Sequence, residues 1–233
     1  MPPMTDIVRK RNLPHIDVDG KPYFITACLD GSIPATGLRK IRAYRTELAN
    51  RPKPVGLTDT QWKLNQHKLV FKLVDQLLDH ESPVTHLDDD RLAAIIENAF
   101  FHFANERYLL LAFVIMPSHH HWLFHPKEKW SESLSTEPGN RKRTPREIIS
   151  HSIQSFTGRK CNELLKTNGP FWQHETFDHY SRNDDETLRI VNYIENNPVA
   201  AGLCEQPDQF RWSSAWHRKK LGLSPTDPIP KVA

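Results

Sequence analysis

The sequence predicts an α+β protein with an antiparallel sheet of four to five strands and helices on its faces. Two observations predict this class: short runs of aromatic and β-branched residues alternate with amphipathic stretches, and Pro117-Ser118 joins two such runs as a hairpin turn. The 233 residues suffice for one domain with a sizeable core. We expect an extended arm at 1–20, a single domain at 21–215 and a tail at 216–233.

The first half of the domain combines one strand with three helices. Residues 21–29 (KPYFITACL) are rich in strand-forming types. A basic helix is expected over roughly 36–50, after breaks at Gly31, Pro34 and Gly37. Apolar residues recur at helical spacing over 59–80 and over 88–105, which predicts two amphipathic helices.

The second half opens with the hairpin. The apolar run at 107–116 (RYLLLAFVIM) is typical of a buried strand, and 119–125 is expected to return beside it. Thr144, Pro145 and Glu147 form a helix start signal. The remaining expected elements are a loop at 127–143, a helix at 145–166, a strand within 170–182, a helix from Asn183 to the break at Asn197-Pro198, and an irregular end at 199–233.

Composition excludes several classes of protein. Mean hydropathy is −0.61 and no apolar run approaches 18 residues, which argues against a membrane span. No basic stretch followed by an apolar run opens the sequence, so we expect no secretory signal. The cysteines Cys28, Cys161 and Cys204 are far apart and form no CxxC, so we expect neither a disulfide framework nor a thiolate zinc site. A reducing cytoplasm fits this cysteine usage.

The net charge of +3 is too small to indicate a nucleic-acid partner by itself. Lys and Arg are nevertheless clustered, and such clusters contact phosphates in nucleic-acid-binding proteins. The alternative is a set of solvated surface charges. The four clusters are Arg9-Lys10-Arg11, the run from Arg39 to Arg45, Arg141-Lys142-Arg143, and Arg218-Lys219-Lys220.

Histidine is unusually frequent, with 13 in the chain and three in succession at 119–121. On a strand, His119 and His121 share one face, whereas His120 points to the other. Two imidazoles on one face are suitable ligands for a divalent ion. The alternative is a pair of ordinary hydrogen-bonded histidines, so the interpretation requires a third ligand.

The last helix offers a third ligand. Tyr193 and Asn197 are four residues apart and therefore neighbours on one helical face. Tyr193 lies roughly 160° and Asn197 about 120° around the helix from Val191, which belongs to its apolar stripe. This position favours a functional tyrosine over a core one, although a boundary tyrosine with a solvated hydroxyl fits the same spacing. Tyr180 is a rival, but the residue four positions on from it is Asp184.

Two paired motifs carry a family resemblance. MPSHHHWLF at 116–124, followed by YIENNPVAAGL at 193–203, resembles the HUH superfamily of single-strand DNA endonucleases. More narrowly, the pair resembles the REP-associated tyrosine transposases. FITA at 24–27 is similar to the first strand of that family, and FWQHETFDHYSRND at 171–184 is similar to its Trp-Gln strand. The resemblance covers roughly 21–215.

The resemblance implies a ferredoxin-like HUH fold and a role for each matched residue. His119, His121 and Asn197 would hold Mg²⁺ or Mn²⁺, and Tyr193 would attack a DNA phosphodiester to give a 5′-phosphotyrosyl intermediate. The implied partners are single-stranded DNA and hairpins of the repetitive extragenic palindrome type. The implied protein is a monomer or a homodimer in the bacterial cytoplasm, associated with the nucleoid.

The chain departs from the family pattern at two places. The middle position between the two histidines is usually apolar, but here it is His120. The segment between the first strand and the hairpin is long, which predicts a helical insertion within 36–105.

DNA binding requires cations for phosphates and aromatic rings for unpaired bases. Trp172 and Trp122 are candidates for base stacking, and the alternative for each is a position in the core. The candidate DNA contacts are Arg141, Lys142, Arg143, Arg159, Lys160, Trp172 and Arg182.

Three other functions share some of these features with DNA cleavage. A non-catalytic, regulatory DNA-binding relative is the strongest alternative, although the chain retains all four matched site residues. A histidine-triad phosphohydrolase needs a histidine at position 123, where this chain has Leu123. A structural metal protein is disfavoured by the absence of paired cysteine ligands.

Overall fold

The computed structural model describes residues 7–10, 14–134, 143–174 and 176–231, with side chains described from residue 18 onward. Its main sheet has four strands in the spatial order β4-β5-β3-β6, and all neighbours are antiparallel. The bounds are Tyr23–Cys28 for β3, Tyr108–Ile115 for β4, His119–Pro126 for β5 and Phe177–Tyr180 for β6. The predicted fold class is therefore confirmed.

The strand order identifies a ferredoxin-like sheet. The chain runs from β3 through helices to β4, turns directly into β5, and passes through further helices to β6. Each pair of strands connected through helices is separated by one antiparallel strand, which is the split βαβ arrangement. The two central strands are β3 and β5, and both are buried over most of their length.

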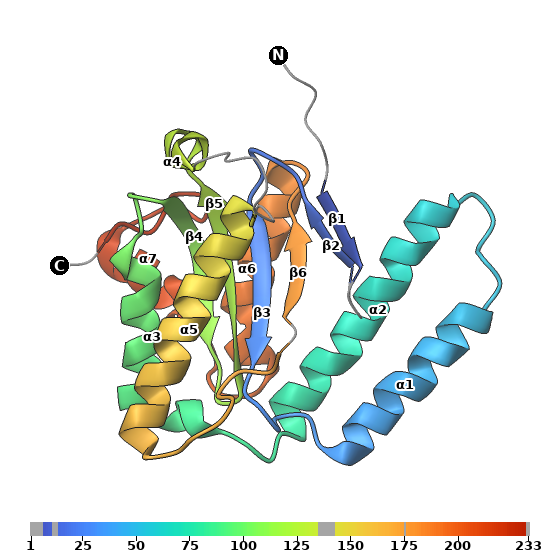
Figure 1. Cartoon of the computed structure of the whole chain (residues 1–233), viewed down its shortest axis with the longest axis horizontal. Helices are drawn as coiled ribbons and strands as arrows, with labels where there is room; N and C mark the ends of the chain where they lie inside the picture. Colours follow the sequence, from blue (N-terminus) through green and yellow to red (C-terminus); the bar gives the residue numbers. More distant parts are fainter. Residues whose placement is uncertain (1–6, 11–13, 135–142, 175, 232–233) are drawn as a thin grey trace.

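Helices cover both faces of this sheet (Figure 1). On one face, α3 (Asp90–His102) packs against α5 (Pro145–Leu165). The other face is covered by α6 (Asp184–Ala200), which packs on β4 and β5. The main core lies on the α3–α5 side and contains Phe100, Phe113 and Trp122. A smaller core beneath α6 contains Phe24, Val191 and Ile194.

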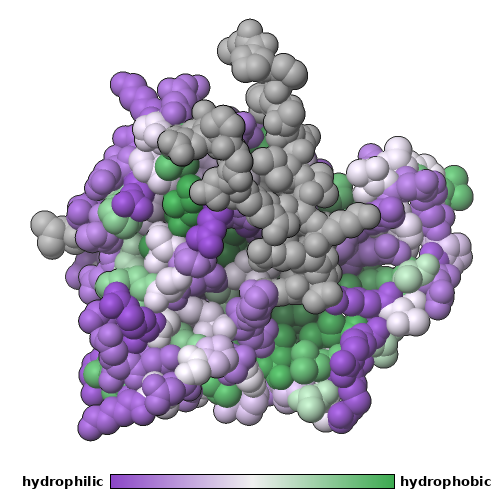
Figure 2. Space-filling view, in the orientation of Figure 1, coloured by the Kyte–Doolittle hydropathy of each residue, from purple (hydrophilic) through white to green (hydrophobic). Residues whose placement is uncertain are grey.

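Two further helices form an antiparallel pair that projects beside the sheet, next to β6 in Figure 1. They are α1 (Ala35–Asn50) and α2 (Asp59–His80), and both precede α3 in the chain. Thr58 and Gln61 form a capping box at the start of α2. The pair has an apolar cluster of its own, in which Ile41 and Leu48 meet Val70 and Leu77. In Figure 2, hydrophobic residues gather at the surface between α5 and this helical pair.

Several elements differ from the expected ones. The arm contains two short paired strands, β1 (Ile7–Lys10) and β2 (Pro14–Asp17), and the expected loop contains α4 (Glu128–Ser133). The expected strand within 170–182 is reduced to the four residues of β6. Helix α6 continues past Asn197-Pro198 to Ala200, because the Ala201 amide still donates to the Asn197 carbonyl and a proline in the last turn removes only one donor.

The C-terminal region is more ordered than expected. Helix α7 (Ser214–Leu221) begins at Ser213, whose side chain accepts a hydrogen bond from the Ala215 amide. Arg218 is buried and donates to the carbonyls of Leu111, Ser224 and Asp227. The polar sequence around Arg218 does not predict that its side chain is buried, because its three carbonyl partners belong to other segments. No helix in the described part of the chain is long and apolar enough to cross a membrane.

Candidate metal and nucleophile site

The three histidines of β5 alternate as predicted. His119 pairs with Cys28 and His121 with Thr26 across the two central strands. Both side chains are fully buried and point to the α6 face, where the His121 ring lies 5.5 Å from that of Tyr193. His120 points to the α3–α5 face and contacts the rings of Phe100 and Trp172 at 5.2 and 4.9 Å.

Hydrogen bonds orient the two site histidines. The hydroxyl of Ser118 donates to the Leu78 carbonyl at 3.0 Å, so its oxygen is left to accept from Nδ1 of His119, also at 3.0 Å. His119 therefore carries its proton on Nδ1 and presents the lone pair of Nε2 to the site. Nδ1 of His121 lies 2.7 Å from the Thr26 hydroxyl, within hydrogen-bond distance. The two Nε2 atoms face each other at 3.1 Å.

A carboxylate that no sequence motif indicates completes this group. Asp75 of α2 is buried, and its Oδ1 lies 3.1 Å from Nε2 of His121 and 3.9 Å from Nε2 of His119. Asp79, one turn further along α2, places Oδ1 at 3.8 Å from Nε2 of His119. In the sequence, Asp75 and Asp79 are two acids four residues apart within the apolar stretch around Leu77 and Leu78. Acids on the apolar side of a helix are unusual, and this pattern could have indicated them as site residues.

Tyr193 meets the same carboxylate from α6. Its hydroxyl donates to Oδ2 of Asp75, and Nδ2 of Asn197 lies 3.4 Å from that oxygen. The tyrosine ring is held edge-on by Phe24 at 5.9 Å and is tilted against Phe71 at 6.0 Å. Asp75 thus contacts the nucleophile candidate through one oxygen and the histidine pair through the other.

Charge and burial fix the protonation states. Burial acts to raise the pKa of Asp75, but the charge and hydrogen bond of His121 outweigh it and lower that pKa to about 2. Burial and the charge of Asp75 raise the pKa of Asp79 to about 7. Burial, reinforced by Asp75, raises the pKa of Tyr193 well above its ordinary value. Burial holds the pKa of His119 well below its ordinary value. The site therefore holds a carboxylate, a neutral His119 and a protonated phenol.

These atoms fit a metal ion. The ligand atoms of Asp75, His119 and His121 lie within 4.8 Å of one another. Two atoms bound about 2.1 Å from one ion at 90–110° are about 3.0–3.4 Å apart, and both 3.1 Å separations at His121 match this. Oδ1 of Asp79 and Oδ1 of Asn197 are buried without a hydrogen-bond partner among the described residues, and Oδ1 of Asp75 has only Nε2 of His121 beside it. Buried oxygens without partners are costly unless a cation satisfies them.

The predicted DNA contacts lie in several parts of the molecule. Arg141 and Lys142 fall outside the described residues, and Arg143 is exposed at the start of α5. Lys160 pairs with Glu163 at 2.8 Å, and Arg182 pairs with Glu186 through two nitrogens, each at 2.7 Å. The two tryptophans are core residues: Trp122 is 1% exposed, and Trp172, 8% exposed, donates its indole N–H to Thr157.

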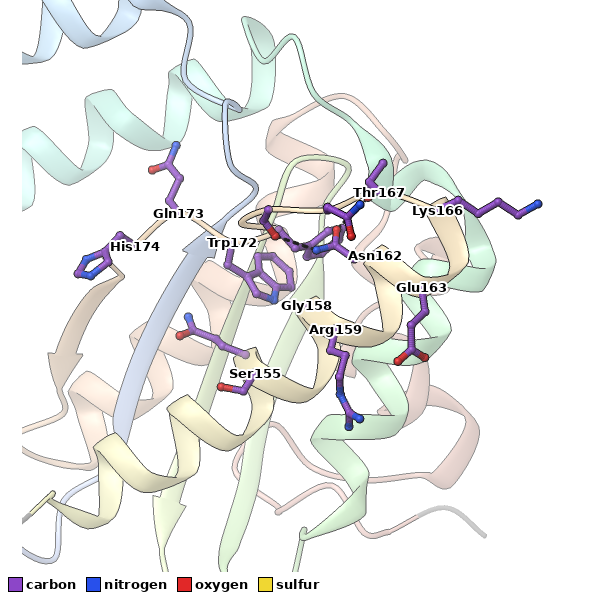
Figure 3. Close-up of a pocket in the computed structure, with 14 residues that line it drawn as sticks. Ser155, Gly158, Arg159, Asn162, Glu163, Lys166, Thr167, Trp172, Gln173 and His174 are labelled. Atoms are coloured by element: carbon purple, nitrogen blue, oxygen red, sulfur yellow. Dashed lines mark hydrogen bonds between the residues drawn. The ribbon is translucent and has the colours of Figure 1, made fainter.

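Arg159 lines a cavity of about 800 Å³ beside α5, together with the edge of Trp172 (Figure 3). Helix α5 covers the face of the sheet to which His120 points. This cavity is therefore separated from His119 and His121 by the sheet.

Three comparisons with known proteins were informative to different degrees. No protein-family model matches the chain, and no curated protein matches it. Among solved structures, the chain is similar to a REP-associated tyrosine transposase bound to a REP hairpin, with 16% identity and a TM-score of 0.44 over 90% of this chain and 86% of that one.

Proposed function

We propose that this protein cleaves and rejoins DNA strands, with Tyr193 as the nucleophile and a divalent ion bound beside it. The observation that carries the proposal is the shared carboxylate of Asp75. One of its oxygens accepts the hydrogen bond of the Tyr193 hydroxyl, and the other faces the histidine pair. A nucleophile and an ion site in direct contact is the arrangement that phosphoryl transfer requires.

His119, His121 and Asp75 would hold the ion, with Asn197 and Asp79 as neighbouring oxygen donors. Imidazole nitrogens mixed with carboxylate and amide oxygens suit Mn²⁺ or Mg²⁺. When bound, the ion would polarise a scissile phosphate and stabilise the charge that develops on it. Ser118 and Thr26 keep the two Nε2 atoms directed at the ion by holding the Nδ1 atoms.

The remaining chemistry belongs to the side chains. Tyr193 Oη forms a bond to phosphorus, and its proton passes to Oδ2 of Asp75, its hydrogen-bond acceptor. The bond from phosphorus to the 3′ oxygen breaks, and that oxygen takes up the proton transferred to Asp75 and leaves as a 3′-hydroxyl. The 5′-phosphotyrosyl bond retains the energy of the phosphodiester, so a second 3′-hydroxyl can reverse the step and join two strands.

We propose single-stranded DNA and hairpins of the repetitive extragenic palindrome type as partners, bound by a monomer or a homodimer. One observation favours the non-catalytic alternative: His119 and His121 are both 0% exposed, and α2 places Asp75 and Phe71 against them. The two histidines are therefore covered in this structure. A regulatory protein that binds DNA without cleaving it does not need to expose them.

The test is the formation of a covalent protein–DNA adduct. Labelled hairpin DNA with a single-stranded extension is incubated with Mn²⁺ and the wild-type protein or Tyr193→Phe, and adducts are resolved under denaturing conditions. We expect an adduct with wild type only, and its loss on chelation of the ion. An adduct that persists in Tyr193→Phe contradicts the assignment of the nucleophile, whereas binding without any cleavage supports the regulatory alternative.

A further inference from the structure

We infer that Lys68 and Lys72 of α2 bind the phosphates of the DNA strand that approaches Tyr193. This inference rests on the proposed function and names contacts that the sequence motifs do not indicate. It assigns the α1–α2 pair, which is additional to the ferredoxin-like plan, a role as one wall of the DNA-binding surface.

The first argument is the position of the two lysines on α2. Lys68 precedes Asp75 by seven residues, which is two turns, so it lies about 10 Å along the axis and within about 20° of the same direction. Lys72 precedes Asp75 by three residues and lies about 60° around the helix from it. Both lysines are exposed, whereas Asp75 is buried. The side of α2 that enters the site thus continues outward as a basic surface.

The second argument is that this surface faces β6. Phe71, which lies about 60° around α2 from Lys68, packs on Phe177 of β6 with ring centroids 4.2 Å apart. Burial lowers the pKa of His179 against the opposing effect of Glu186, and the positive charge of Lys68 adds to that lowering. Lys68 therefore lies near the outer part of β6, on the side of the sheet occupied by His119 and His121.

The third argument is the availability of positive charge. Arg182 is neutralised by Glu186, and Lys160 by Glu163. Arg159 lines a cavity on the opposite side of the sheet. No carboxylate in the described part of the chain pairs with Lys68 or Lys72, although three other cations of this region do pair: Lys40 with Glu81, Arg51 with Glu47, and Lys53 with Asp59.

The fourth argument is electrostatic. Asp75 and Asp79 place negative charge where a phosphate would have to approach, and like charges at short distance repel strongly when buried. A bound ion offsets this negative charge at the metal site itself, but it does not attract a DNA phosphate that is still outside the site. Two unpaired lysines one to two turns outward on the same helix supply the attraction that steers a polyanion inward.

Binding measurements test the inference without requiring cleavage. The probe is a fluorescent single strand of mixed sequence and about 20 nucleotides, because phosphate contacts do not depend on sequence. All proteins carry Tyr193→Phe, so bound DNA stays intact. Anisotropy titrations with Mn²⁺ are run between about 50 and 200 mM KCl. The test protein adds Lys68→Ala and Lys72→Ala, and the matched control adds Arg51→Ala and Lys53→Ala at the far end of the same helical pair.

Log K for DNA binding falls as log salt rises, and loss of two phosphate contacts should make this fall less steep by about 1.4. The same loss should weaken DNA binding about 10- to 30-fold near 0.1 M salt. The control should match the parent, and Lys68→Arg with Lys72→Arg should restore the slope. Unchanged Mn²⁺ binding by the alanine protein shows that the site remains folded. Equal slopes for the test and control proteins overturn the inference and leave the proposed function standing, whereas a parent that binds no DNA overturns both.

Discussion

Tyr193 donates its hydroxyl hydrogen to the carboxylate of Asp75, although 118 residues separate them in the sequence. The contact joins α6, which covers one face of the sheet, to α2 of the helical pair beside β6. It places a phenol, a carboxylate and two imidazoles around one buried point. The structure therefore brings together all four residues indicated by the motifs and adds an acid from a segment that had no assigned role.

Replacement of Asp75 by Asn tests the carboxylate as an ion ligand. Asp75→Asn keeps the size of the side chain but removes its charge, so we expect Mn²⁺ affinity to fall more than about 100-fold, beyond the usual effect of an outer-shell change. Isothermal titration calorimetry measures the affinity. The melting temperature without metal should fall, because Asn cannot replace the charge interaction with His121 that lowers the pKa of Asp75. Unaltered Mn²⁺ affinity would place the ion elsewhere.

Asn197 is expected to have a smaller effect. Its Oδ1 is buried without a partner among the described residues, but its Nδ2 is the atom that lies close to Asp75. We expect Asn197→Ala to weaken Mn²⁺ binding by about 10-fold, in the range of supporting residues. The same calorimetric titration measures it beside Asp75→Asn. A larger loss of Mn²⁺ affinity for Asn197→Ala than for Asp75→Asn would show that Asn197, and not Asp75, is the third ligand.

His120 should be replaceable by an apolar residue. Both of its ring nitrogens are buried without a hydrogen-bond partner in the described structure, and burial lowers its pKa to about 3. His120→Leu removes two unsatisfied polar atoms, so we expect the free energy of unfolding to stay level or rise by about 1 kcal/mol. Urea denaturation measures this change. A loss of more than about 1 kcal/mol would show that the imidazole fits its pocket better than leucine does.

Glu97 should make stability dependent on pH. Burial acts to raise its pKa, but hydrogen bonds from His217 at 2.8 Å and from Arg211 at 2.6 Å outweigh it and lower the pKa. The folded-state pKa then lies below the unfolded value of about 4.3, so the stabilisation is present above that pH and disappears as pH falls through the folded value.

Urea unfolding of wild type and Glu97→Gln at several pH values measures this contribution. The variant should be less stable at pH 7, and the difference should shrink steadily below about pH 4. A difference that does not change with pH would mean that the Glu97 charge contributes nothing.

Local patterns predicted most of the sheet and helices. Strand β3 was recognisable from its aromatic and β-branched residues, and α5 from Thr144 and Glu147 at its start. Alternation along β5 correctly separated His119 and His121 from His120. These predictions succeeded because each depends on neighbours within one element.

Asp75 and α7 were missed because both depend on contacts between distant segments. An acid in an apolar stretch of α2 indicates a function only once the helical pair is placed beside β5. Arg218 reads as a surface charge until its carbonyl partners on β4 and in the C-terminal loop are known. Trp172 reads as a base-stacking candidate until its indole is found bonded to Thr157.

The most direct test of the central claim is the identity of the residue that becomes linked to DNA. Wild-type protein is incubated with Mn²⁺ and hairpin DNA, the DNA is digested to a short remnant, and the tryptic peptides are sequenced by mass spectrometry. We predict a nucleotide attached to Tyr193, with Tyr180 unmodified in the same sample. Attachment at Tyr180, or DNA cleavage without any attached nucleotide, would contradict the account.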